Sequence, residues 1–91
     1  MKPLVNFQVG QIVISKSGRD KGMIFIVLST EGEYLYLADG KLRSMLKPKK
    51  KKLKHVQPTK TISALTVQAI SSGRLLDSDL RKAIAEFRDK I

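Results

Sequence analysis

The chain has 91 residues, of which 42% are hydrophobic, and carries a formal net charge of +10 without a single cysteine. This length suits one small domain, which buries about 60–65% of the unfolded chain's surface and leaves no room for a catalytic cleft between two lobes. The lack of cysteine excludes disulfides and thiolate metal sites. No apolar run approaches the roughly 18 residues of a membrane span, and residues 1–3 do not begin a signal peptide, so we expect a cytoplasmic protein.

The excess positive charge is concentrated in one segment. Residues 1–40 carry four basic and four acidic side chains, and residues 61–91 carry five basic and four acidic ones. Residues 41–60 carry nine basic side chains and no acidic one. Charges gathered in this way repel one another unless a polyanion supplies counter-charge, which favours nucleic-acid binding. The alternative is a flexible lysine tract that only keeps the protein in solution.

The first part of the chain has the pattern of short strands. Residues 10–15 run through β-branched side chains, and residues 23–28 form an apolar run short enough for a buried strand. Residues 34–37 alternate tyrosine and leucine, so one pair faces inward. We favour the tyrosines as cover for the core over a base-stacking platform or a methyl-lysine cage.

Two further strands are predicted beyond the Asp39-Gly40 hairpin signal, at residues 42–46 and 53–56, with Pro48 interrupting the pairing between them. Five short strands joined by tight turns predict a small, strongly bent barrel, which with its basic tract covers residues 7–57.

The last part of the chain changes to helical periodicity and predicts a two-helix hairpin over residues 61–91. The apolar stripe of the first helix consists of Ile62, Leu65, Ala69 and Ile70, and that of the second helix of Leu80, Ala83, Ile84, Phe87 and Ile91. The segment 71–73 ends the first helix with a glycine, and Asp77 begins the second at the end that the helix dipole favours for an acid. The stripes are expected to pack on the barrel rather than on a partner protein.

Residues 9–22, followed by the apolar run 23–28, resemble a KOW motif, which occurs in several ribosomal proteins and transcription elongation factors. This resemblance implies an SH3-like barrel. Further segments resemble the large-subunit ribosomal protein L-fourteen-e family and, more closely, its short bacterial relatives, which are KOW-domain RNA-binding proteins. These segments are residues 39–43, 47–56, 58–59 and 76–83.

The resemblance also implies roles in the loop 18–22. Gly22 is expected to end a hairpin loop where a side chain would obstruct, and Arg19 and Lys21 to project toward RNA. A tight hairpin holds two cations close enough for neighbouring phosphates, and such contacts position a protein without reading sequence. A plain turn with its charges in water remains the alternative.

The candidate RNA contacts are the cations of this loop and of the basic segment, together with the sole histidine. They are Lys16, Arg19, Lys21, Lys41, Arg43, Lys47, Lys49, Lys50, Lys51, Lys52, Lys54 and His55. The tract 47–54 is expected to order only when bound, to neutralise phosphates and to stay outside the core. One histidine cannot build a metal site, and it lacks a nucleophile and carboxylate nearby, so we expect no metal, no cofactor and no enzyme activity.

The sequence therefore predicts a mainly β RNA-binding protein with C-terminal helices. We expect it to be ribosome-associated, with ribosomal RNA of the large subunit and neighbouring ribosomal proteins as partners, and a monomer when free. The alternative is a KOW-type protein–protein adaptor in transcription or translation. Membrane association is disfavoured, because no lipidation signal or apolar anchor accompanies the lysines.

Overall fold

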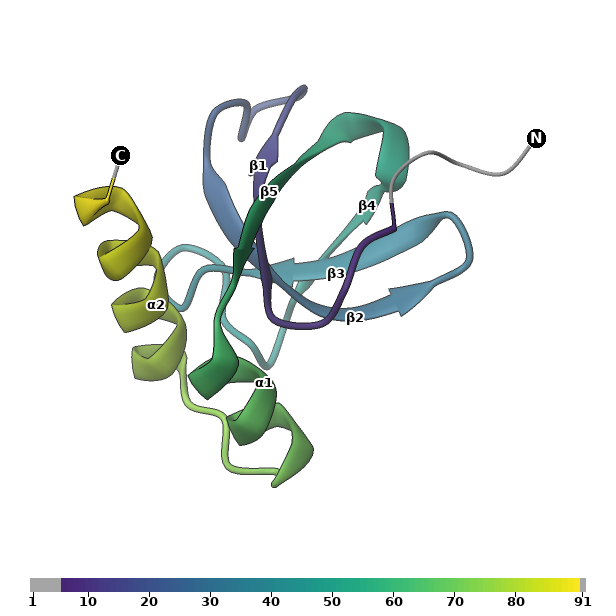
Figure 1. Cartoon of the computed structure of the whole chain (residues 1–91). Helices are drawn as coiled ribbons and strands as arrows, with labels where there is room; N and C mark the ends of the chain where they lie inside the picture. The colour runs from purple at the N-terminus through teal and green to yellow at the C-terminus, as the bar shows by residue number, and fades with distance from the viewer. Residues whose placement is uncertain (1–5, 91) are drawn as a thin grey trace.

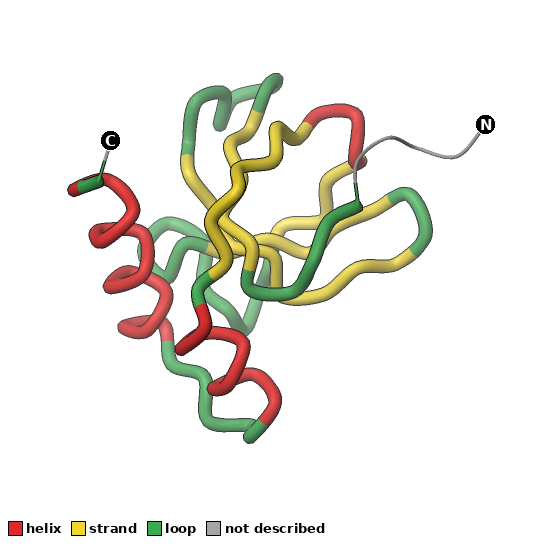
Figure 2. Tube along the Cα trace, viewed as in Figure 1, coloured by secondary structure: helices red, strands yellow, loops and turns green. Residues whose placement is uncertain are grey.

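The computed structural model describes residues 6–90, which form five strands followed by two helices (Figures 1 and 2). In chain order the elements are β1 (Gln11–Ser15), β2 (Ile24–Glu31), β3 (Tyr34–Ala38), β4 (Lys49–Lys52), the 3₁₀ turn η1 (Leu53–His55), β5 (Val56–Ile62), α1 (Ala64–Ser71) and α2 (Asp77–Asp89). The predicted mainly β fold with C-terminal helices is confirmed.

The strands form one antiparallel sheet in the order β4-β3-β2-β1-β5. β2 is shared: residues 24–26 pair with β1, and residues 26–31, except Leu28 at a register shift, pair with β3. The register of β2 shifts between Val27 and Ser29, and such a bulge bends a strand. β1 and β5 consequently run across β3 and the later part of β2 in Figure 1, and the sheet is strongly curved.

Alternation along the strands divides the buried side chains between the two faces of the curved sheet. The interior cluster lies inside the curve and consists of Val13, Phe25, Val27, Leu35, Leu37 and Val56. The second cluster lies between the sheet and α2 and consists of Ile12, Ile26, Ala38, Leu80, Ala83 and Ile84. Leu80, Ala83, Ile84 and Phe87 of the second helix therefore pack on the sheet, as predicted, while Ile91 of the same predicted stripe lies outside the described residues.

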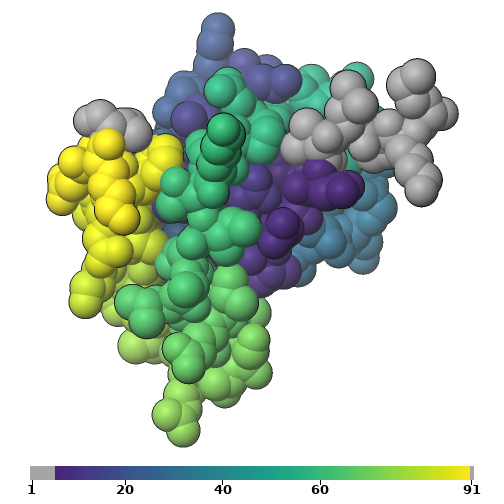
Figure 3. Space-filling model, in the orientation of Figure 1, coloured from purple at the N-terminus to yellow at the C-terminus, as the bar shows by residue number. Residues whose placement is uncertain are grey.

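The first helix differs from expectation in what it buries. α1 ends at Ser71 as predicted, but Leu65 is 66% exposed, and Ile62 belongs to β5. α1 buries Thr66 instead, whose hydroxyl donates to the Oγ of the N-cap residue Ser63 at 2.8 Å. Figure 3 shows α2 lying against α1 on the surface of the molecule.

Two strand predictions were wrong. Residues 42–46 form part of a loop between β3 and β4, and residues 53–55 form η1, so that the fifth strand begins only at Val56. The fourth strand is the lysine run itself, whose backbone pairs with β3 from Leu37↔Lys49 to Tyr34↔Lys52. Pro48 precedes this strand rather than ending the pairing.

Candidate nucleic-acid interface

The β1–β2 loop exposes its cations and buries its acid. Arg19 and Lys21 are exposed, whereas Asp20 between them is only 7% exposed. Gly22 has a φ of +88°, but apart from its two chain neighbours no described residue has an atom within 4 Å of where its Cβ would be. The loop therefore needs glycine there for its backbone conformation and not, as expected, because a side chain would obstruct.

Asp20 joins this loop to the lysine run. Its Oδ1 accepts hydrogen bonds from Ser15 Oγ at 2.6 Å and from Lys51 Nζ at 3.0 Å, and its Oδ2 lies 2.6 Å from Lys49 Nζ. Lys51 also donates to the carbonyl oxygen of Ser17 at 2.9 Å. Burial alone would raise the pKa of the Asp20 carboxyl, but hydrogen bonds from Lys49, Ser15 and Lys51 together outweigh it and hold that pKa well below its ordinary value.

Alternation along β4 separates the four lysines into two pairs with different surroundings. Lys49 and Lys51 share the face of Leu37 and Leu35, their partners on β3, which is the interior side of the sheet. Since only 9% of the Lys51 side chain is exposed, the expectation that the whole tract stays outside the folded core was wrong. Its ammonium is tolerated there because Asp20 and the Ser17 carbonyl oxygen supply acceptors.

Lys50 and Lys52 point to the outer face of the sheet and are exposed. The Lys50 ammonium lies 4.5 Å from the centroid of the Tyr34 ring, and the Lys52 ammonium lies 5.9 Å from it. Tyr34 and Tyr36 thus face outward beneath lysines, while Leu35 and Leu37 are the inward pair. The tyrosines belong to neither apolar cluster, contrary to their expected role as cover for the core.

The loop 39–48 presents the next group of cations, and Lys41, Arg43 and Lys47 are all exposed. Its first turn is held by Asp39, whose Oδ1 accepts from the backbone N–H groups of Lys41 at 3.0 Å and of Arg43 at 2.8 Å.

The first turn of α2 anchors the same loop from the other side. Asp77 accepts from Ser44 Oγ and from the Met45 backbone N–H, both at 2.7 Å, and the Arg81 guanidinium donates to the Gly40 carbonyl oxygen at 2.6 Å. The hydrogen bonds from Met45 and Ser44 lower the pKa of the Asp77 carboxyl. Because a Cβ on Gly40 would clash with the Asp77 carbonyl oxygen, only glycine permits this approach.

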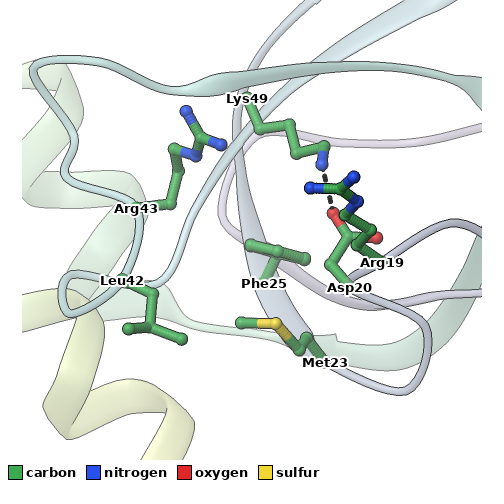
Figure 4. A pocket seen from close by; sticks show the side chains of 7 residues that line it. All are labelled: Arg19, Asp20, Met23, Phe25, Leu42, Arg43 and Lys49. Atoms are coloured by element: carbon green, nitrogen blue, oxygen red, sulfur yellow. Dashed lines mark ion pairs between the residues drawn. The ribbon is translucent and has the colours of Figure 1, made fainter.

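A shallow pocket of about 280 Å³ lies where the two loops and β4 meet (Figure 4). Three cationic side chains border it, namely Arg19, Arg43 and Lys49. Met23, Phe25 and Leu42 contribute its apolar lining. In Figure 4, Lys49 points to Asp20 with Arg19 beside it, and Arg43 lies on the opposite side of the pocket. Residues from three separate segments therefore bring positive charge to one place.

The other candidate contacts lie around the turn into β5. Lys16 and Lys54 are exposed, and His55 is half-buried. The backbone N–H of Lys16 donates to the His55 carbonyl oxygen at 2.8 Å, so the end of β1 and η1 lie side by side.

Sequence reasoning missed Asp20 and Asp77 as the residues that position the cations. Both were visible as acids next to predicted cationic or helical segments, but no local pattern connects either of them to its partners. Lys51 is 31 residues from Asp20, and Ser44 is 33 residues from Asp77.

Among residues 6–90, no helix is long and apolar enough to cross a membrane. In the comparisons with known proteins, no family model matches the chain, and no curated protein matches it either.

Proposed function

We propose that the protein binds RNA through the cationic side chains of the β1–β2 loop, the loop 39–48 and β4. The observation that carries this proposal is the convergence of cations from segments far apart in sequence. Asp39 and Asp77 hold the backbone of the loop 39–48, and Asp20 holds β4 to the β1–β2 loop through the side chains of Lys49 and Lys51. Cations on anchored backbones lose less conformational freedom on binding than those of a flexible tail.

The finer description of the fold and of the target belongs to the same proposal. A small, curved five-stranded antiparallel sheet is compatible with an SH3-like barrel, and the resemblance of residues 9–22 to a KOW motif supports that fold. The resemblance to the ribosomal protein family supports ribosomal RNA of the large subunit as the target. Contacts to phosphates then position the protein on folded RNA, and the shape of that RNA contributes selectivity.

A protein–protein adaptor is the second candidate, and exposed leucines favour it. Leu42 is 75% exposed and Leu46 is 82% exposed, both within the anchored loop 39–48. Apolar side chains presented in this way are often covered by a protein neighbour. In a ribosomal setting both functions are compatible, with cations on RNA and leucines on an adjacent protein.

The salt dependence of RNA affinity tests the proposal, because each cation that neutralises a phosphate adds about 0.7–0.9 to the log–log slope. The variant Lys50→Ala/Lys52→Ala should flatten the slope by about 1.4–1.8 and leave the fold intact, since both side chains are exposed. The matched control Lys82→Ala/Lys90→Ala removes two exposed cations of the C-terminal region and should leave the slope unchanged.

The measurement is titration of labelled ribosomal RNA at several salt concentrations. Equal slopes for the wild type and the β4 variant would remove β4 from the interface. An affinity that does not depend on salt in the wild type would contradict phosphate binding and favour the adaptor.

A further inference from the structure

The outer face of β2, β3 and β4 carries a regular array of side chains. The register places Ser29, Tyr36 and Lys50 side by side in one row, and Glu31, Tyr34 and Lys52 in the next. Neighbours in register share a face of the sheet, so the two tyrosines form the middle column between a column of lysines and one that holds the acid.

Charge is distributed unequally across this array. The cations lie on the β4 side of the tyrosines, and the Glu31 carboxylate lies on the β2 side. The Tyr36 hydroxyl donates to Glu31 Oε1 at 3.2 Å, which ties the acid to the ring next to it. A polyanion that crosses this face is therefore attracted to β4 and repelled from β2.

We propose that this face binds unpaired nucleobases of RNA, which stack on Tyr34 and Tyr36 while Lys50 and Lys52 bind the flanking phosphates. The inference rests on the proposed RNA binding and adds the class of RNA, because stacking on a protein ring requires bases that are not paired. The RNA backbone then runs along β4, and the bases extend over β3.

The spacing of the rings suits this ligand. Two residues of a strand span about 6.7 Å, which is roughly twice the 3.4 Å rise between stacked bases. Each ring can therefore take one base of a splayed single strand. The ammonium groups now above Tyr34 are held by exposed cation–π contacts, which are weaker than a stacked base, and they can move aside to a phosphate.

Intrinsic fluorescence reports this face directly. The chain has two tyrosines and no tryptophan, and both tyrosines lie in the array. We expect an unstructured single-stranded RNA to quench the tyrosine emission as it binds. A duplex RNA with the same number of phosphates should bind through the cations but leave the emission nearly unchanged. A polyglutamate chain is the control for a ligand with charge and no bases.

The variants separate ring stacking from charge. Tyr34→Leu/Tyr36→Leu should weaken the affinity for single-stranded RNA at least about fivefold for each ring removed, and the affinity for duplex RNA much less. Tyr34→Phe/Tyr36→Phe keeps the rings and should retain the preference for single strands. Binding is followed by the anisotropy of labelled RNA, and folding by circular dichroism.

Three results would overturn the inference. RNA binding without any change in tyrosine emission would rule out base stacking on this face and leave the proposed function intact. Equal quenching by polyglutamate or by duplex would mean that the face responds to negative charge alone. Absence of RNA binding by anisotropy would remove the proposed function, and the stacking face with it.

Discussion

At the scale of single residues, Asp20 shows how one side chain organises the lysine run. It lies between two exposed cations in the sequence, yet its carboxylate turns inward and holds two lysines of β4. One acid thereby partly neutralises Lys49 and Lys51, fixes the β1–β2 loop against the sheet and leaves Arg19 and Lys21 outside. The lysines of β4 are consequently not equivalent, although the sequence presents them as one uniform run.

Removing this carboxylate should destabilise the fold. Asp20→Ala leaves the buried Lys51 ammonium without its acid, and breaking such a pair costs about 3 kcal/mol of unfolding free energy. Urea denaturation measures the loss. Asp89→Ala removes an exposed acid of the same charge and should change the stability little. Equal stabilities of the two variants would show that the lysines of β4 need no internal partner.

The stability of the wild type should also fall in acid, and the sign follows from the depressed pKa of Asp20. Below about pH 4 the unfolded chain binds a proton at this residue that the folded chain does not. The stabilisation is thus complete above that pH and is lost as the pH falls toward the folded-state pKa. The Asp20→Ala variant should lose less stability than the wild type between about pH 5 and about pH 3, since only the shifted groups that remain, such as Asp77, contribute.

At the scale of elements, the apolar periodicity of the sequence predicted the strands and the helix whose formation depends on burying apolar side chains. β1, β2, β3 and α2 follow their apolar patterns, because the three strands divide their buried residues between the two clusters and α2 buries its own in the cluster between the sheet and the helix. β4 could not be predicted, since lysine is disfavoured in strands and no apolar residue marks the run. The pairing of β4 depends on contacts with β3, with Asp20 and with the tyrosine rings, and these groups come close to the lysine run only in the folded structure.

The packing of α2 gives a prediction in which position matters more than size. Leu80 is fully buried between the sheet and the helix, whereas Phe87 is only half-buried at the margin of that cluster. Leu80→Ala should therefore cost about 3 kcal/mol of unfolding free energy, and Phe87→Ala clearly less, although phenylalanine is the larger residue. Thermal or urea unfolding distinguishes the two. The reverse order would mean that the end of α2 packs more tightly than its exposure indicates.

For the molecule as a whole, the position of charge should matter more than its amount. The β1–β2 loop and the link between α1 and α2 lie at opposite ends of the molecule in Figure 1. Arg19→Glu/Lys21→Glu should weaken RNA binding about tenfold or more without unfolding the protein, because both residues are exposed.

Arg74→Glu/Lys82→Glu changes the net charge by the same amount at the helical end and should reduce affinity much less. Filter binding at one salt concentration compares the two variants, and circular dichroism checks that both are folded. A similar loss in both would indicate that only the net charge is recognised and that RNA has no fixed orientation on the protein.

The outermost strands of the sheet, β4 and β5, have a consequence for how copies of the protein behave toward each other. A free strand edge can pair with the edge of another copy and begin an aggregate. β4 opposes this with a lysine at every position, and β5 contains Pro58, which has no N–H to offer a second strand. Replacing all four lysines with neutral residues would leave β4 able to pair with a strand of another copy. The lysines should therefore be replaced in pairs, and each variant should be checked for self-association by light scattering.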